Sequence, residues 1–110
     1  MNTPSYGVVM RMGVPAYQPE VCIFIDPQGT AFTLRPHEAP HSPKLIIIEA
    51  EGDQPTEKQL HTLECMYAIL ALHYQISALH LCPAILPHLT RIRVGKAHAQ
   101  KQLPKAQSQA

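Results

Sequence analysis

The sequence predicts an α/β or α+β domain: a small mixed sheet of four or five short strands with one main helix packed on it. Two apolar segments rich in β-branched residues, Val21–Asp26 and Leu45–Glu49, are typical of strands. A third segment, residues 56–74, has the apolar spacing of an amphipathic helix. The chain has 110 residues, the size of one domain, and shows no internal repeat.

The strands are predicted in order along the first half of the chain. Tyr6–Met12 is β-prone and begins the sheet. Val21–Asp26 follows, and the Asp-Pro-Gln-Gly sequence of Asp26–Gly29 predicts a tight turn. Thr30–Leu34 is then the return strand of a hairpin. Leu45–Glu49 is apolar on both faces, which is typical of a central strand.

The main helix is predicted to begin at a capping box. Thr56 takes the N-cap position and Gln59 the third helical position, so that each side chain bonds the other residue's backbone N–H. The helix extends to about residue 74. Its buried stripe is expected to consist of apolar residues at helical spacing, widened by Met66 and Ile69: Leu60, Leu63, Tyr67, Leu70 and Tyr74.

The last third of the chain completes the sheet. Ile76–Leu81 predicts a short strand or extended link, and Pro83 and Pro87 bracket a short turn or helix. Lys96–Ala110 contains Leu103 as its one large apolar residue and predicts a flexible tail. Residues 1–95 are therefore expected to form the compact domain, and residues 96–110 the tail.

Composition excludes several function classes. The formal net charge of +1 argues against a polybasic nucleic-acid binder. The longest apolar run, Cys65–Leu72, is too short to cross a bilayer, so no membrane partner is expected. No secretory signal precedes the domain, and the three cysteines are irregularly spaced. We therefore expect a cytoplasmic protein with reduced, buried thiols.

Histidines occur near other metal-ligating or catalytic residue types at two places. His37 and His41 match H-E-x-x-H, but the surrounding prolines disfavour the required helix and predict a polar surface loop. His80 and Cys82 are two residues apart and would share one side of a strand, with His88 nearby. They are weak zinc-ligand candidates without a complete ligand set; the alternative is a structural cysteine beside a surface histidine.

Two further pairs have spacings that suit catalysis. His61 and Cys65 are one helical turn apart, as a nucleophile and its base require, but the neighbouring buried stripe favours an inert core cysteine. Glu49 and Glu51 follow a predicted strand and would face the same side. They fit either an acid/base pair or solvated loop charges.

The order of several short motifs resembles zinc-dependent N-acetylmuramoyl-L-alanine amidases of the peptidoglycan-recognition type. That family runs from a strand through a D-x-x-G turn, a histidine loop, an I-G-I-E strand and a T-x-x-Q helix to Tyr-x-Ile. The resemblance covers roughly residues 6–87. The segments that match these motifs, in chain order, are Asp26–Gly29, Pro40-His41-Ser42, Ile46–Glu49, Thr56–Gln59 and Tyr74–Ile76.

The positions of the family's zinc ligands hold other residues here. The family's first ligand ends the first strand, where this chain reads VVMRMG. The second lies in a Gly-His segment, whose nearest equivalent is Leu81-Cys82, and the third has no counterpart in RIRVGK. The resemblance therefore implies a degenerate relative that lacks hydrolysis, with no catalytic residue and no cofactor, zinc being the only candidate.

Three functions are compatible with this resemblance. The first is a non-catalytic amidase-like module that binds a peptidoglycan fragment or a protein partner. The second is a small phage or mobile-element protein that inhibits or adapts a larger assembly. The third is an active zinc amidase with atypical ligands. For the first, the expected ligand-binding groove joins two loops and a strand end, with these residues: His37, His41, Glu49, Glu51, His80, Cys82 and His88.

Overall fold

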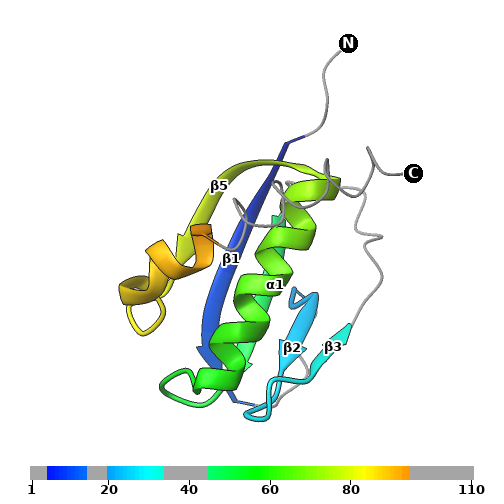
Figure 1. Cartoon of the computed structure of the whole chain (residues 1–110). Helices are drawn as coiled ribbons and strands as arrows, with labels where there is room; N and C mark the ends of the chain where they lie inside the picture. The colour runs from blue at the N-terminus through cyan, green and yellow to red at the C-terminus, as the bar shows by residue number, and fades with distance from the viewer. Residues whose placement is uncertain (1–4, 15–19, 34–44, 95–110) are drawn as a thin grey trace, which may run out of the picture.

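The computed structural model describes residues 5–14, 20–33 and 45–94 of the chain. Five strands form one sheet in the order β3-β2-β4-β1-β5 (Figure 1). The elements are β1 (Ser5–Gly13), β2 (Ile23–Ile25), β3 (Ala31–Thr33), β4 (Leu45–Glu51), α1 (Glu57–His73), β5 (Gln75–Leu81) and the 3₁₀ helix η1 (Leu86–His88).

The sheet is mixed, and its central strand is β4. β4 is parallel to both of its neighbours, β1 and β2. β1 is also parallel to β5, and β3 closes the hairpin by pairing antiparallel with β2. The predicted fold class, a small mixed sheet with one main helix, is confirmed. The prediction that Leu45–Glu49 forms a central strand is also confirmed, because β4 is the middle strand of the five.

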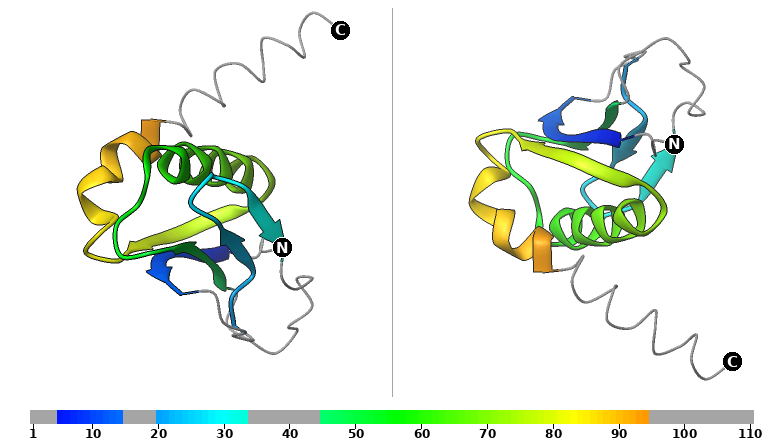
Figure 2. Two further views of the ribbon diagram at one scale, coloured as in Figure 1. Left: turned by 90° about the horizontal axis from the view of Figure 1, so that it is seen from below. Right: turned by 90° about the horizontal axis from the view of Figure 1, so that it is seen from above.

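One face of the sheet is covered by α1 and residues 83–94, which lie on the same side of it (Figure 2). Alternate residues of the strands point to this face because successive side chains of a strand point in opposite directions. None of the helices in the described ranges is long and apolar enough to cross a membrane. The core residues are Val8, Met10, Ile25, Ile48, Ala50, Leu60, Leu63, Tyr67, Ile85 and Ile92.

The β2–β3 turn is attached to the first turns of α1. The Asp26 carboxylate accepts hydrogen bonds from the backbone N–H groups of Gln28 and Thr30, and Gly29 has a φ of 87°. The Thr62 hydroxyl donates to the Gly29 carbonyl at 2.6 Å. A side chain at position 29 would require the rare left-handed backbone and would meet the Lys58 carbonyl at 2.8 Å, so this contact requires glycine.

Gln59 connects the helix start to two strands. Its side chain is fully buried, and its Nε2 donates to the carbonyls of Ile25 and Glu51, at 3.3 and 2.9 Å. Its Oε1 accepts from the backbone N–H of Thr56, whose hydroxyl in turn accepts from the Gln59 N–H. The predicted capping box is confirmed, and its glutamine also bonds to backbone carbonyls at the ends of two strands.

The prediction of a buried helix stripe is wrong for two of its residues. Ile69 is 47% exposed and Tyr74 is 38% exposed. The buried hydrophobic residues of α1 are Leu60, Leu63, Tyr67 and Ala68, so burial is confined to the centre of the stripe. Tyr74 has an extended backbone at the helix end and contacts the Tyr6 ring edge-to-face at 4.8 Å. The predicted tail, residues 96–110, and its boundary with the domain lie outside the described residues.

Candidate functional site

The carboxyl ends of β1 and β4 lie side by side where the chain changes direction across the sheet. After β1 the chain passes to β2 on one side, and after β4 the α1 crossover passes to β5 on the other. In sheets of parallel strands, ligands bind at such a switch point, outside the carboxyl ends of the strands. The backbone joins the two ends there, because the Gly52 N–H donates to the Gly13 carbonyl at 2.8 Å.

Three charged side chains are connected by hydrogen bonds at this switch point. Arg11 of β1 is directly opposite Glu49 of β4 in the parallel register. The Arg11 Nε donates to Glu49 Oε2 and its Nη2 donates to Glu20 Oε2, both at 3.1 Å. Glu49 is only 3% exposed, whereas the Glu20 side chain is half exposed. One guanidinium thus compensates a buried carboxylate and a surface carboxylate together.

The Glu49 carboxylate lies against the backbone of Gly13. A Cβ atom at position 13 would be 2.4 Å from both Cδ and Oε2 of Glu49. Real side chains do not approach this closely, so the absence of a side chain at Gly13 makes room for the carboxyl group. Gly13 therefore helps to position Glu49 in its contact with Arg11.

The strand register extends this pair into a row across the sheet. Glu49 is opposite Phe24 of β2, and Phe24 is opposite Phe32 of β3. All four side chains point away from α1, because their neighbours Met10, Ile25 and Ile48 belong to the core on the other face. We call these residues the transverse row: Phe32, Phe24, Glu49 and Arg11.

Hydrogen bonding favours the charged forms of Arg11 and Glu20. Burial opposes the charge on Arg11, but hydrogen bonds to Glu20 and Glu49 outweigh it and raise the pKa of Arg11. The backbone N–H of Glu20 and the Arg11 guanidinium lower the pKa of Glu20. The row therefore consists of two aromatic rings, followed by the buried Glu49 carboxyl group and the guanidinium that binds it.

Two solved structures share this arrangement of strands and helix. N-acetylmuramoyl-L-alanine amidase LysC from Clostridium intestinale URNW is 18% identical, with a TM-score of 0.57, over 72% of this chain and 70% of that chain. Endolysine N-acetylmuramoyl-L-alanine amidase LysCS from the same organism is 19% identical, with a TM-score of 0.59, over 72% and 69%. The chain has an amidase-like fold. No family model and no curated protein matches the sequence.

Within this amidase-like fold, the residues expected to line one groove lie on both faces of the sheet. Glu49 and Glu51 face away from α1, opposite Arg11 and Gly13. His80 also faces away from α1, opposite Val9. The register separates His80 from Glu49 by two strand spacings and two residues along the strand, about 12 Å. His37 and His41 lie outside the described residues.

Cys82 and His88 lie with the α1 face instead. Cys82 follows the end of β5 and packs against the core, and its backbone accepts bonds from Ile85 and Leu86. His88 ends η1, which sits between the core residues Ile85 and Ile92. His80 and Cys82 were predicted to lie on the same side of a strand. They do not, because β5 ends at Leu81 and Cys82 packs against the core. Across the described ranges, no three His, Cys, Asp or Glu side chains are grouped to hold a metal ion.

The prediction that Cys65 is buried in the core is wrong. Cys65 is exposed, and its Sγ lies 3.7 Å from the Nε2 of His61. The buried arc of α1 is narrow, with Leu60, Leu63 and Tyr67 at its centre, so a residue at its flank reaches solvent. The other two thiols are only partly buried.

The sequence interpretation also missed two ion-pair clusters. Arg11 stands alone as a charge in the first strand, and its counterpart is the Glu that ends LIIIE, so complementary charges in apolar strands were the available signal. Arg91 binds Glu57 and Glu64 of α1, which are seven residues apart and share one helix face. That spacing was visible, but the fold was needed to bring Arg91 to it.

Proposed function

We propose that this chain is an amidase-fold module that binds a peptidoglycan fragment without hydrolysing it. The observation that carries the proposal is the transverse row, which brings both phenylalanines of the chain beside a fixed carboxylate–guanidinium pair. The row ends at the switch point of the sheet, where folds of this kind bind ligands. The likeness of the fold to two amidases supports the ligand class.

The chemistry of peptidoglycan suits such a surface. Its sugar rings have apolar C–H faces, and its short peptides carry amino and carboxylate groups. An exposed aromatic ring can cover a sugar face, and Phe32 is 46% exposed. Few, well-oriented polar groups then fix the orientation of the ligand. The Arg11 guanidinium is suited to this role, because its side chain is 30% exposed and the buried Glu49 holds it in place.

The sequence pattern supports the absence of hydrolysis. The resemblance places a zinc-ligating histidine at the end of the first strand, and β1 ends in Met12 and Gly13. The second histidine position corresponds to Leu81-Cys82, where the cysteine packs against the core. A binding role requires none of these ligands, so we propose that the module retains recognition alone.

Retention on insoluble peptidoglycan tests the binding. The unmodified protein should sediment with purified sacculi, and Phe32→Ala should reduce the bound fraction several-fold because the aromatic surface of the row is lost. Ile69→Ala is the matched control. Ile69 is equally exposed, at 47% against 46% for Phe32, but lies on α1, on the other side of the sheet. Its removal should leave retention unchanged.

Three outcomes would count against the proposal. No retention above that of a control protein would overturn peptidoglycan binding and favour the alternative of a protein-binding module. Equal loss with Phe32→Ala and Ile69→Ala would overturn the role of the row. Release of new peptide amino termini from sacculi, measured with Zn²⁺ supplied, would overturn the non-hydrolytic part and favour an amidase with atypical ligands.

A further inference from the structure

The outer side of α1 carries a histidine and a cysteine in contact. His61 and Cys65 are one helical turn apart, so their side chains lie on the same stripe. Both residues are exposed. The Sγ of Cys65 is 3.7 Å from the Nε2 of His61. Two strong metal-ligand atoms thus meet at a position open to solvent, on the opposite side of the sheet from the transverse row.

Their separation suits chelation of one ion. A zinc-class cation binds thiolate sulfur at about 2.3 Å and imidazole nitrogen at about 2.0–2.1 Å. At a tetrahedral angle these bond lengths place the two ligand atoms about 3.5 Å apart. The observed 3.7 Å therefore needs a shift of a few tenths of an ångström, which exposed side chains on a rigid helix accommodate.

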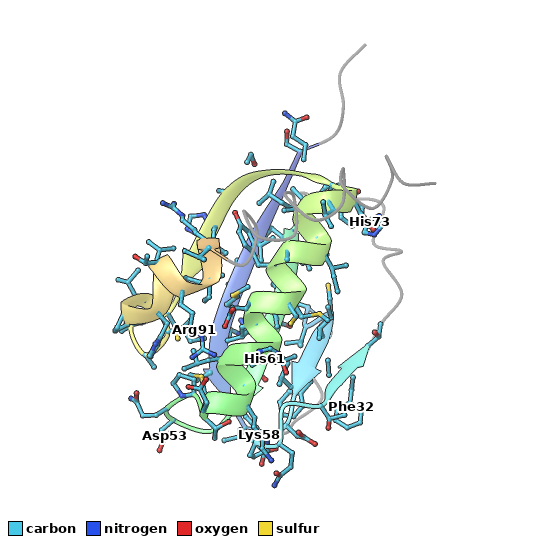
Figure 3. All side chains as sticks on the ribbon, viewed as in Figure 1. Phe32, Asp53, Lys58, His61, His73 and Arg91 are labelled. Atoms are coloured by element: carbon cyan, nitrogen blue, oxygen red, sulfur yellow. The ribbon has the colours of Figure 1, made fainter. Side chains whose placement is uncertain are left out.

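The charges around the pair do not oppose a cation. Glu57 and Glu64 of α1 lie on the same side of the helix as His61 by their spacing, and both bind Arg91. His61, Lys58 and Arg91 are labelled in Figure 3. The Arg91 guanidinium is held by two carboxylates, so its positive charge is more than balanced. Lys58 lies one turn before His61 on the same helix face. Glu57, Glu64, Arg91 and Lys58 together therefore carry no net charge beside the pair, so no excess positive charge repels a divalent cation.

We propose that His61 and Cys65 chelate one thiophilic divalent cation of the Zn²⁺ class per chain. On binding, the Cys65 S–H bond breaks, its proton passes to solvent and the thiolate forms the metal–sulfur bond, with no change of oxidation state. His61 binds through Nε2 as neutral imidazole. No third His, Cys, Asp or Glu is grouped with them within the described ranges, so water completes the coordination.

Cobalt titration tests the site. Reduced, tag-free protein is titrated with Co²⁺, which reports sulfur ligation through its thiolate-to-metal absorption band. We expect one Co²⁺ per chain, competition by Zn²⁺ and release of about one proton per ion. Cys65→Ser should abolish the band, and His61→Gln should weaken binding by about tenfold or more. Cys22→Ser and Cys82→Ser are the matched thiol controls and should retain the band.

Any of the following three results would overturn the proposed metal site. A band that persists in Cys65→Ser, or one lost equally in Cys82→Ser, would assign the sulfur to another cysteine. Unchanged affinity in His61→Gln would show that the thiolate binds without the imidazole. A stoichiometry of one Co²⁺ per two chains would overturn chelation within one chain. Circular dichroism should show unchanged helix content, because both side chains are exposed.

Discussion

Gly13 and Glu49 show how one missing side chain shapes the candidate site. The carboxylate of Glu49 occupies the space that a Cβ at position 13 would fill. Its contact with the Arg11 guanidinium depends on that space, because the carboxyl group reaches Arg11 from beside the Gly13 backbone. The buried charge of Glu49 is thus compensated only while residue 13 is glycine.

Gly13→Ala should therefore destabilise the protein. The new methyl group must displace the Glu49 carboxylate, and the resulting strain costs about 1–3 kcal/mol of unfolding free energy. Urea unfolding followed by circular dichroism measures this difference. Gly7→Ala is the matched control in the same strand, because its Cβ meets only the end of the flexible Leu45 side chain, at 3.0 Å. A loss no larger than that of Gly7→Ala would contradict the assignment.

At the level of secondary-structure elements, Gln59 holds α1 to the ends of two strands. Its amide group donates to carbonyls of β2 and β4 and accepts from the helix N-cap. The same residue completes the capping box, so the start of the helix and its position on the sheet depend on one side chain. A purely local cap would fix the helix start alone.

Gln59→Leu should lower stability strongly. Leucine fits the apolar volume but leaves buried backbone groups without partners, at roughly 1–3 kcal/mol for each group left unsatisfied. The urea midpoint should fall accordingly. Gln75→Leu provides the comparison, because Gln75 is an exposed residue at the start of β5. Similar midpoints for the two variants would show that the Gln59 amide contributes little to holding the helix.

At the scale of the whole molecule, Arg91 ties the last described segment to α1. Its Nη2 lies 2.6 Å from Glu57 Oε2, and its Nε binds Glu64. Hydrogen bonds from Arg91 lower the pKa of Glu57 below its ordinary value of 4.5. Because the folded-state pKa is the lower one, this contact stabilises the fold above the unfolded pKa and is lost as pH falls through the folded one.

The difference in stability between the parent protein and Arg91→Met should follow that pH dependence. It should be fully present near pH 7 and should vanish on acidification below the lowered pKa of Glu57. High salt should also reduce it, since the Glu57 side chain is exposed. Arg93→Met, at an exposed position two residues on, is the control. A difference that stays constant from pH 7 to pH 3 would contradict an ionic role for Arg91.

The elements of this molecule were predictable from the sequence where the determining contacts are local. The Asp26–Gly29 turn and the Thr56–Gln59 capping box each depend on residues within a few positions, and both are confirmed. The transverse row was not predictable in the same way. Phe24 and Glu49 meet only through the register of β2 with β4, which distant backbone pairing determines.

Some site residues lie on the face of the sheet that the sequence predicted and others do not. Glu49 and Glu51 were expected to share a side, and the strand alternation preserves this. His80 and Cys82 were expected to lie on the same side of one strand, but the strand ends between them and Cys82 packs against the core. Cys65 was misplaced because apolar residue type says little about how wide the buried arc of α1 is.

The position of β1 between two later strands has a consequence for how the chain folds. β1 precedes both of its partners, the strands β4 (Leu45–Glu51) and β5 (Gln75–Leu81). Its backbone can pair on both sides only when the chain has been made through residue 81. Such distant parallel pairing is slow, since a long loop must close before any bond forms. Its apolar segment, Val8–Met10, therefore lacks at least one of its two neighbouring strands until β5 is complete.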